Sequence, residues 1–432
     1  MDANPPVIRL DGVSMGFAKP SGETLPVLAG IDLAVEDGEI LGLLGRSGSG
    51  KSTLFRIAAG LIHPSAGRVE YRGAPLAGPT EGIAVVFQTF ALYPWLTVAE
   101  NVELGLDALA LPPAEARRRA QQAIDLIGLD GFKGAYPREL SGGMRQRVGF
   151  ARALVSDPVL LLMDEPFSAL DVLTAETLRT DFLDLWVGRQ LATRAVLLVT
   201  HNIEEAVIMC DRILVLGANP GHIAAEIKVP LAQPRNRLDP AFHAVVDEIY
   251  AILTSRMAES LTAQGRLHGG IVQQVPMVTP LALAGFVEAL AAAPHDDHAD
   301  LAGIGRKLAL EARHLFPLAA ALHILEFAEL KDGAIRLTAA GRVFAQAEGA
   351  KRKSLFREHL LRFVPLAGHI RQVLDERDVH KAPRGRFELE LQDHLNREDA
   401  ERTLRAVTAW GRYADLFAYD DRSRSFSLEA AE

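Results

Sequence analysis

One short stretch of the sequence, GRSGSGKST from Gly45 to Thr53, has the composition and spacing of a loop that binds phosphate groups. It follows the apolar run EILGLLG and precedes the helical pattern KSTLFRIAAGL, which is the context that the GxxxxGK[ST] motif requires. Glycines allow backbone N–H groups to turn inward around phosphate oxygens, and the N-terminus of the following helix adds its positive end. Lys51 is suited to bridge the β- and γ-phosphates, and the Ser52 hydroxyl is suited to contact Mg²⁺. The residues expected to bind the nucleotide here are Gly45, Ser47, Gly48, Ser49, Gly50, Lys51, Ser52 and Thr53.

Two adjacent acids end a second apolar run, LLLMDEP from Leu160 to Pro166. Asp164 is suited to hold Mg²⁺ through water, and Glu165 to act as base or orienting acceptor for the water that attacks the γ-phosphate. Adjacent acids at the end of a strand are often only solvated. Together with the glycine-rich loop upstream, however, this pair indicates hydrolysis of a nucleoside triphosphate.

A second Gly-Gly turn, LSGGMRQRV from Leu140 to Val148, also leads into a helical pattern. With this element the sequence resembles the ATP-binding cassette family over roughly residues 7–230, and the turn resembles the family's signature motif. Three further motifs stand in the family's order: Gln88 in VVFQ as the Q-loop, SALD ending at Asp171 as the D-loop, and His201 in LLVTHN as the switch histidine. Phe17 stands where the family usually places a Tyr on the adenine ring, and either ring offers a π-face for stacking.

The resemblance implies a site that is shared between two copies of the chain. In the family, two ATP molecules lie between the subunits of a head-to-tail dimer, so Ser141, Gly142 and Gly143 would face the γ-phosphate held by the partner copy. Asp171 would line the seam between the copies. The resemblance further implies Glu165, His201 and Gln88 as the catalytic residues and Ser52, Gln88 and Asp164 as ligands of Mg²⁺. The expected activity is hydrolysis of ATP to ADP and phosphate.

The segment after the Q-loop narrows the resemblance to importers. About 90 residues separate Lys51 from Ser141, which leaves no room for the long coiled coil of chromosome-structuring relatives. FQTFALYPWLTVAENVELGL, together with GANPGHI further on, resembles the ATPases that import nitrate, sulfonates, taurine and bicarbonate. This branch implies two transmembrane permease subunits as partners, a solute-binding protein as an indirect partner, and a small oxyanion or organosulfur solute. The candidate permease contacts are Leu92, Tyr93, Pro94 and Trp95, which could instead belong to the core of the helical insert.

The elements that must position these residues are apolar runs alternating with helical patterns. The runs EILGLLG, GIAVVFQ, VLLLMDE, AVLLVTH and RILVLG predict strands buried on both faces of a mainly parallel sheet. Between Gln88 and Asp157 no such run occurs, and PPAEARRRAQQAIDLIGL predicts an amphipathic helix. We therefore expect an α/β P-loop NTPase domain over residues 1–236, with a helical subdomain at about 89–158, and a helical linker over 237–264.

The remaining residues, 265–432, predict an α+β domain of two winged-helix-like units in tandem. Helices at residues 281–292, 301–311 and 314–330 lead to FAELKDGAIRLTAAGRVFAQ, a pattern of strand, Asp-Gly turn, strand and helix. A second copy follows in FELELQDHL, a helix from an N-cap at Asn396 through Tyr413, and a hairpin in DLFAYDDRSRSFSL. This part resembles the C-terminal AAA-associated domain found on some importer ATPases.

Winged-helix units often bind DNA, so the alternative function is a soluble ATP-driven switch whose tail grips DNA or a regulatory protein. The expected recognition helix, residues 315–328, contains no Lys or Arg, and residues 265–432 carry 23 Lys and Arg against 24 Asp and Glu. We therefore expect a regulatory role and no nucleic-acid partner. The basic run KRKSLFR at 351–357 is expected to be a solvated helix face, and HDDH at 295–298 a polar loop rather than a metal site.

Composition sets the remaining limits. The 432 residues are 49% hydrophobic and 23% charged, with a net charge of -9 that favours neither nucleic acid nor anionic lipid. The single cysteine, Cys210, excludes an internal disulfide and fits a reducing compartment. The longest apolar stretch, TPLALAGFVEALAAAP, is interrupted by Glu288 and is too short to span a bilayer. We expect a cytoplasmic protein that reaches the inner face of the membrane through its partners.

Overall fold

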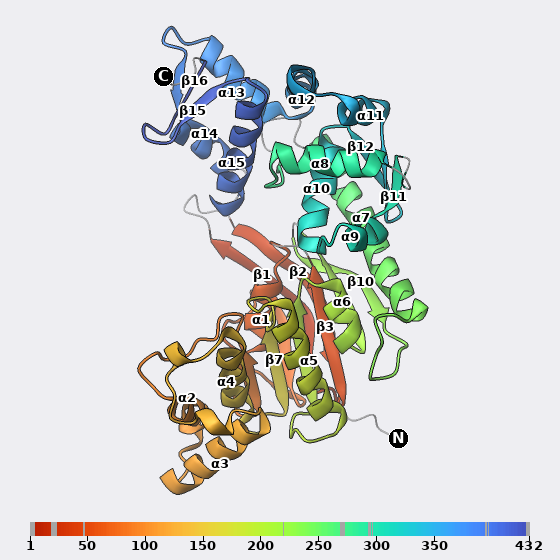
Figure 1. Cartoon of the computed structure of the whole chain (residues 1–432). Coiled ribbons are helices and arrows are strands. Elements are labelled where there is room, and N and C mark those ends of the chain that lie inside the picture. The colour runs from red at the N-terminus through yellow and green to blue at the C-terminus, as the bar shows by residue number, and fades with distance from the viewer. Residues whose placement is uncertain are drawn as a thin grey trace. The chain divides into compact units, whose positions relative to one another are not determined.

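The computed structural model divides into two compact units, Met1–Val246 and Asp247–Glu432 (Figure 1). It describes residues 5–18, 24–45, 48–218, 220–267, 273–292, 295, 297–393, 395 and 397–428. The helix expected as a linker is α7 (Pro240–Leu267), and its part from Asp247 onward belongs to the second unit.

The first unit is built on a sheet in which, over the described residues, six strands lie in the order β10-β9-β3-β8-β7-β6. The strands are β3 (Glu39–Gly45), β6 (Ile83–Val86), β7 (Leu160–Asp164), β8 (Ala195–Thr200), β9 (Arg212–Gly217) and β10 (His222–Lys228). All neighbours pair in parallel except β9 and β10. Every residue of β3 and β8 is buried, as expected for strands covered on both faces. The predicted α/β core is therefore confirmed, and the five apolar runs are its five parallel strands.

The register of this sheet brings three of the predicted motifs to one edge. Leu44 at the end of β3 pairs with Thr200 at the end of β8, and Asp164 at the end of β7 pairs with Val199. Because parallel strands end on the same side, the glycine-rich loop, the acids after β7 and His201 after β8 all leave the sheet together.

An antiparallel sheet, which the sequence patterns do not predict, covers the other side of the first helix. Its order is β2-β1-β4-β5, formed by β1 (Ile8–Ala18), β2 (Thr24–Val35), β4 (Ala66–Tyr71) and β5 (Ala74–Pro75). Helix α1 (Lys51–Ala58) inserts Leu54, Phe55 and Ile57 into a core shared by both sheets. The pairing of β1 with β2 shifts register between Leu10 and Val13 and again near Met15, which interrupts the alternation that a strand prediction needs.

The segment between β6 and β7 forms the expected helical subdomain. It contains α2 (Val98–Glu103), η1 (Leu104–Leu109), α3 (Pro113–Leu126), η2 (Asp130–Phe132), η3 (Pro137–Glu139) and α4 (Gly142–Leu154). Val102, Ile124 and Val148 contribute to a separate apolar core. The buried Asn101 closes the entry to α2, because its side chain accepts from Tyr93 N at 2.9 Å and donates to Leu96 O at 3.0 Å. In Figure 1 the helices α2 and α3 stand on the side of α4 away from β7.

The second unit contains two lobes with the same order of elements, helix–strand–helix–helix–hairpin. The first lobe is α8 (Pro280–Ala291), β11 (His298–Asp300), α9 (Leu301–Lys307), α10 (Ala312–Ile324), β12 (Ala328–Lys331) and β13 (Ala334–Leu337). The second lobe is α13 (Pro365–Asp375), β14 (Lys381–Pro383), α14 (Arg384–Gln392), α15 (Arg397–Tyr413), β15 (Ala418–Asp420) and β16 (Ser425–Ser427). The sheet orders match as well, β11-β13-β12 and β14-β16-β15. The structure thus confirms the tandem winged-helix-like prediction.

Some predicted boundaries in the second unit are wrong. The helix expected at 314–330, with its recognition part at 315–328, is α10 (Ala312–Ile324), so it begins earlier, ends earlier and contains Arg313. Glu326 ends it with a left-handed backbone (φ 56°), and Ala328 already belongs to β12. The buried Phe327, Ala328 and Leu330 continue the apolar pattern of the helix, which is why the sequence extends it too far. Helix α9 likewise ends at Lys307 rather than at residue 311. The predicted N-cap Asn396 lies outside the described residues.

Aromatic side chains join the two lobes. The rings of Phe327 and Phe344 are stacked with centroids 4.4 Å apart, and Phe356 lies 6.1 Å from Phe344 and 6.0 Å from Trp410. Phe327 lies just before β12, Phe344 on α11 (Ala339–Gln346), Phe356 on α12 (Gly349–Phe363) and Trp410 on α15. The indole Nε1 of Trp410 donates to Val278 O at 2.8 Å, ahead of α8. The second unit is therefore one packed body around an aromatic core. None of the helices in the described part of the whole chain has the length and apolar character needed to cross a membrane.

Candidate nucleotide site

The glycine-rich loop joins β3 to α1 in a conformation that needs glycine. Gly48 and Gly50 have φ of 80° and 90°, in the left-handed region that side chains other than glycine rarely adopt. A Cβ on Gly50 would also lie 2.6 Å from Leu28 Cδ2 of the antiparallel sheet. Ser47, one of the predicted contacts, lies outside the described residues. The two glycines thus let the backbone turn sharply into the N-terminus of α1.

Two polar groups at the start of α1 have the properties of a phosphate site. Lys51 is buried and its Nζ donates to Gly45 O at 2.6 Å. Burial lowers the pKa of Lys51, and the carboxylates of Glu165 and Asp164 oppose that shift. The Ser49 hydroxyl is buried without a hydrogen-bond partner among the described residues, a state that costs free energy. A buried cation beside an unpaired hydroxyl suits an anionic ligand with oxygen acceptors, as a phosphate is.

The predicted catalytic residues meet at one carboxylate. Glu165 Oε2 lies 3.0 Å from His201 Nδ1 and accepts from Gln88 Nε2 at 3.2 Å. The backbone of Glu165 is left-handed (φ 46°), and its N–H donates to Val199 O at 2.9 Å on the neighbouring strand. The structure therefore brings together side chains from the ends of β6, β7 and β8, and it places the Glu165 side chain beyond the sheet edge.

The expected Mg²⁺ ligands are Ser52, Gln88 and Asp164. Ser52 is exposed, and Asp164 is half-buried at the end of β7. Burial raises the pKa of Asp164, helped by the neighbouring Glu165 and opposed by Lys51 and Arg56. The donors are hydroxyl, amide and carboxylate oxygens, which are the ligand types that Mg²⁺ prefers, and phosphates usually complete such a site. Within the described ranges no group of three or more His, Cys, Asp or Glu residues could hold an ion alone, the HDDH stretch included as far as it is described.

The signature turn is a well-formed helix start. The Ser141 hydroxyl accepts from Met144 N at 3.2 Å and caps α4, while Ser141 itself stays exposed. Gly143 is buried, and a Cβ there would lie 2.2 Å from Thr174 Cγ2 on α5 (Val172–Val187). Gly142 is less constrained, with Leu170 Cδ2 at 3.8 Å from its ideal Cβ. Gly143 therefore has a packing role that the sequence motif did not reveal.

The predicted seam residue, Asp171, caps the next helix. Its carboxylate accepts from Thr174 N at 3.0 Å and from Thr174 Oγ1 at 2.7 Å. These bonds, the hydroxyl one foremost, lower the pKa of Asp171. The next two residues, Val172 and Leu173, leave 78% and 79% of their surface exposed. These two exposed apolar side chains at the start of α5 are available for contact with another molecule.

Two further groups of predicted contacts lie on the surface. Phe17, expected to stack on adenine, is exposed near the end of β1. Tyr93, Pro94 and Trp95 are exposed, with 68% of the Trp95 surface accessible, whereas Leu92 packs partly into the core of the helical subdomain. The rings of Tyr93 and Trp95 contact each other with centroids 5.2 Å apart.

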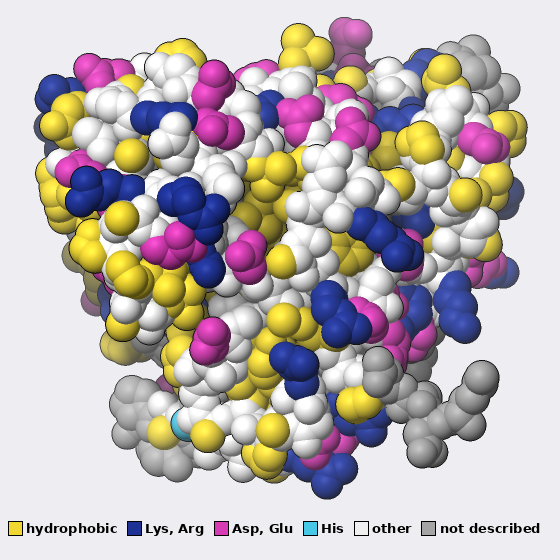
Figure 2. Space-filling view, turned by 90° about the horizontal axis from the view of Figure 1, so that it is seen from below, with side chains coloured by type: hydrophobic (Ala, Val, Ile, Leu, Met, Phe, Trp, Pro, Cys, Tyr) yellow, Lys and Arg dark blue, Asp and Glu magenta, His cyan; other side chains and the backbone are white. Residues whose placement is uncertain are grey.

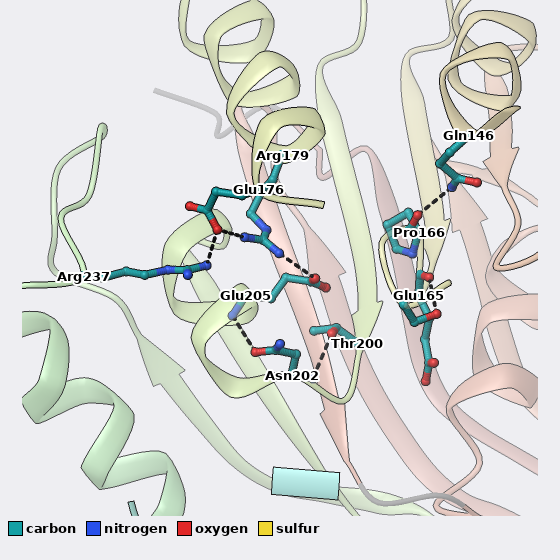
Figure 3. A network of polar contacts seen from close by, with 10 residues as sticks. Gln146, Glu165, Pro166, Glu176, Arg179, Thr200, Asn202, Glu205 and Arg237 are labelled. Carbon is teal, nitrogen blue, oxygen red and sulfur yellow. Dashed lines mark hydrogen bonds and ion pairs between the residues drawn. The ribbon is translucent and has the colours of Figure 1, made fainter. Parts of the chain in front are cut away.

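The sequence motifs missed several residues that support the site. Ser168 accepts from Gln88 Nε2 at 3.4 Å and donates to Glu165 O at 2.9 Å, which closes the turn after β7. Behind the site, Arg179 and Glu205 form a buried ion pair (Figure 3). In the sequence, Asn202 followed by Glu205 has the spacing of a capping box, in which Glu205 would fold back to the Asn202 N–H. Instead Thr200 Oγ1 accepts from Asn202 N at 3.0 Å, and Glu205 turns inward to Arg179.

Two family models match the sequence. The model described as ABC transporter covers residues 28–168, and the model described as C-terminal AAA-associated domain covers residues 303–420. The two matches fall in different units of the structure.

This chain is similar to several curated proteins over most of the length of each of them. An uncharacterized ABC transporter ATP-binding protein of Methanocaldococcus jannaschii is 42% identical over 241 residues, which is 56% of this chain and 89% of that protein. A nitrate import ATP-binding protein of Synechocystis sp. is 41% identical over 55% of this chain and 91% of its own. A taurine import ATP-binding protein of Pseudomonas putida is 42% identical over 52% of this chain and 84% of its own. A solved dimeric ATP-binding cassette, bound to ADP and phosphate, is 33% identical over 52% of this chain and all of its own, with a TM-score of 0.46.

Proposed function

Since this chain belongs to the ATP-binding proteins of ABC transporters, we propose that it hydrolyses ATP to power the import of a small oxyanion or organosulfur solute. The observation that supports the chemistry most directly is the meeting of Glu165, His201 and Gln88 beside the buried Lys51.

The glycine-rich loop binds the phosphates of ATP. Lys51 supplies a cation that burial has already stripped of water, so its attraction to phosphate oxygens is strong. The Ser49 hydroxyl gains the partner that it lacks, and the backbone N–H groups at the start of α1 point toward the same oxygens. Phe17 offers its exposed ring to the adenine.

Glu165 acts as the general base for the attacking water. The water oxygen bonds to the γ-phosphorus while the bond from that phosphorus to the bridging oxygen breaks, and the water proton passes to the Glu165 carboxylate. His201 and Gln88, each within hydrogen-bond distance of Oε2, hold the carboxylate in place. The products are ADP and phosphate. Mg²⁺, held by Ser52, Asp164 and Gln88 together with phosphate oxygens, would neutralise charge on the phosphates.

The exposed ends of α4 and α5 support a dimer of two copies. Ser141 and Gly142 leave the N-terminus of α4 open, and a helix N-terminus favours the negative γ-phosphate of an ATP bound to the partner. Val172 and Leu173 provide apolar contact beside Asp171. In this arrangement ATP favours the closed dimer because both copies contact the γ-phosphate only in that state.

The helical subdomain provides the surface for a permease. Tyr93, Pro94 and Trp95 form an exposed apolar surface, against which a helix of a membrane subunit could pack. Leu92 instead packs against the core of the helical subdomain. The sequence allowed this stretch to be either a permease contact or subdomain core, and we assign the first role to residues 93–95 and the second to Leu92. Docking here places the chain on the inner face of the membrane.

The names of the relatives suggest the class of solute. Relatives of this chain are named as import ATP-binding proteins for nitrate, taurine and aliphatic sulfonates. These solutes are small and carry an oxygen-rich anionic group. We propose the same class for the importer that this chain serves.

The surface of the second unit does not favour the alternative of a DNA-binding switch. The one basic side chain of α10 besides histidine, Arg313, pairs with Glu311 at 2.9 Å, and in the basic run Arg352 pairs with Glu288 and Lys353 with Asp415. Figure 2, which views the molecule from below Figure 1, shows basic and acidic side chains interspersed on that face as well. We assign the second unit a regulatory role through protein contacts.

The test is purification of the tagged full chain from detergent-extracted membranes of its own host, followed by reconstitution in vesicles. We expect a multi-span permease to purify with the chain, and ATP-dependent uptake of labelled nitrate, taurine or an alkanesulfonate. The Glu165→Gln variant is the control, since it should retain the permease and lose uptake. A chain that hydrolyses ATP but purifies without permease, and shifts labelled DNA in a salt-sensitive manner, would favour the switch instead.

A further inference from the structure

A buried ion pair in the first unit lies near the turn that carries His201. Arg179 on α5 and Glu205 on α6 (Ile203–Met209) are 6% and 5% exposed, and Arg179 Nη2 lies 3.4 Å from Glu205 Oε2 (Figure 3). Burying two charges costs several kcal/mol of solvation per ion, so such a pair seldom adds to stability when compared with apolar side chains. What the pair does supply is a fixed geometry between the two elements that carry it.

Glu205 is attached to the turn that carries His201. Its backbone N–H donates to Asn202 Oδ1 at 3.0 Å, and the Asn202 N–H donates to Thr200 Oγ1 at 3.0 Å. These bonds close the turn from the end of β8 into α6, with His201 between the two capping residues. The same His201 places its Nδ1 3.0 Å from Glu165 Oε2.

Arg179 contacts the segment that follows Glu165. Its guanidinium lies over the ring of Phe167, 5.4 Å from the centroid, and Phe167 follows Glu165 by two residues. A second nitrogen, Nη1, donates to Glu176 Oε2 at 3.0 Å, and Arg237 contacts that same carboxylate oxygen at 3.1 Å. Arg179 is therefore held from three directions, and its position is set by α5 and by the loop after β7.

The pair thus links two segments of the first unit. One is the loop after β7, which carries Glu165, and the other is the turn after β8, which carries His201. We propose that Glu205 is a positioning residue for ATP hydrolysis, which through Arg179 holds the His201 turn against α5 and so keeps the imidazole on the Glu165 carboxylate. This inference rests on the proposed function. Without the carboxylate, Arg179 keeps Glu176 as its one anionic partner among the described residues, and the turn loses its fixed distance from the Glu165 loop. A displacement of about 1 Å at a catalytic group costs on the order of 100-fold in rate.

The test compares Glu205→Ala and Glu205→Gln in the full chain, alone and combined with His201→Ala. Single-turnover hydrolysis of ATP is measured per molecule that binds a non-hydrolysable ATP analogue, which removes the misfolded fraction from the comparison. We expect Glu205→Ala to slow hydrolysis by about 10-fold or more, while the affinity for the analogue stays within about 2-fold. Glu205→Gln should be slowed less, because the amide retains the shape of the side chain and can still accept from Arg179.

The combination with His201→Ala separates positioning from a general structural effect. If Glu205 acts through His201, Glu205→Ala adds almost no further loss once His201 is gone, since groups that act as a unit are strongly non-additive. Equal factors in both backgrounds would overturn the proposal, as would a Glu205→Ala variant that hydrolyses ATP at the unaltered rate. Absence of ATP hydrolysis in the unaltered chain would instead refute the proposed function, and this inference with it.

The chain offers a matched control in Glu39. Glu39 is also buried, pairs with an arginine (Arg212, 2.7 Å), and has its pKa raised by burial, but it stands at the opposite end of β3 from the glycine-rich loop. Glu39→Gln should lower the melting temperature and leave the rate per analogue-binding molecule within about 2-fold of the unaltered value. A loss of rate in Glu39→Gln equal to that in Glu205→Gln would show that any buried pair produces the effect, and would count against the proposal.

Discussion

The two units of this chain bury different kinds of side chain. In the described part of the first unit four charged residues are buried, Glu39, Lys51, Arg179 and Glu205. Three of them, Lys51, Arg179 and Glu205, lie near the sheet edge where the motifs meet. Within the described part of the second unit, Arg384 is the one buried charged residue, while aromatic side chains are among the largest buried ones in both units. Because desolvated charge is costly, its concentration in one region marks that region as the site of chemistry.

The largest effect is expected when the proposed catalytic carboxylate is replaced and the second unit is left unchanged. Glu165→Gln should lower the rate of phosphate release by about 100-fold to 10,000-fold, because an amide cannot accept the proton of the attacking water. ATP binding should persist, and the dimer should accumulate on size-exclusion chromatography with ATP. Glu115→Gln is the control, since Glu115 lies on α3 in the helical subdomain and pairs there with Arg118 and Arg119. A Glu165→Gln variant with near-normal phosphate release would show that another group is the base.

The next effect should be confined to stability. Phe356→Ala removes a fully buried ring that contacts Phe344 and Trp410, and should lower the free energy of unfolding by about 3 to 5 kcal/mol. The rate of ATP hydrolysis per nucleotide-binding molecule should stay within about 2-fold at a temperature where the variant is folded. Chemical denaturation and a phosphate-release assay measure the two quantities. A collapse of the rate in folded protein would contradict the division of roles between the units.

A smaller effect should separate binding from stability within the first unit. Lys51→Met removes the cation that faces phosphate, and the loss of charge-assisted hydrogen bonds predicts about 10-fold to 150-fold weaker ATP binding. Because burial lowers the pKa of Lys51, its charged form is disfavoured in the folded protein without ligand. We therefore expect the melting temperature of the ligand-free variant to be equal or higher. Titration calorimetry with ATP and a thermal melt would show this, and a markedly lower melting temperature would contradict it.

The smallest effect concerns the start of α5. Bonds from Thr174 lower the pKa of Asp171, so its cap stabilises the fold above the ordinary aspartate pKa and is lost as pH falls through the lowered value. The difference in melting temperature between unaltered chain and Asp171→Asn should therefore change as pH falls below about 4, since an Asn cap does not titrate. A constant difference across that range would mean that Asp171 keeps its cap when protonated.

The stretches that carry the predicted site residues lie at the strand ends expected from the sequence, whereas parts of the surrounding fold were not predicted. Gly45 ends β3 and Lys51 begins α1, and junctions of this kind are set by local interactions that a motif records. The same holds for Asp164 and Glu165 at the end of β7. That these stretches meet follows from parallel strands alone. The functional assignments of the individual residues remain predictions that the experiments above address.

What the sequence could not predict depends on contacts between distant segments. The inward turn of Glu205 requires Arg179, 26 residues away, whereas its local spacing favours a capping box. The sheet of β1, β2 and β4 is bulged, so its strands lack a clean alternation. The early end of α10 at Ile324 depends on the burial of Phe327 just before β12 and of Leu330 within β12, in place of one more helical turn.

The left-handed backbone of Glu165 has a consequence for selection. A residue other than glycine in that region costs about 1 to 3 kcal/mol, which the bond to Val199 O and the turn closed by Ser168 help to hold. A population of variants sorted only for thermal stability, with no ATP present, should therefore enrich glycine at position 165. The carboxylate that we propose as the catalytic base is therefore one that selection for stability alone would remove.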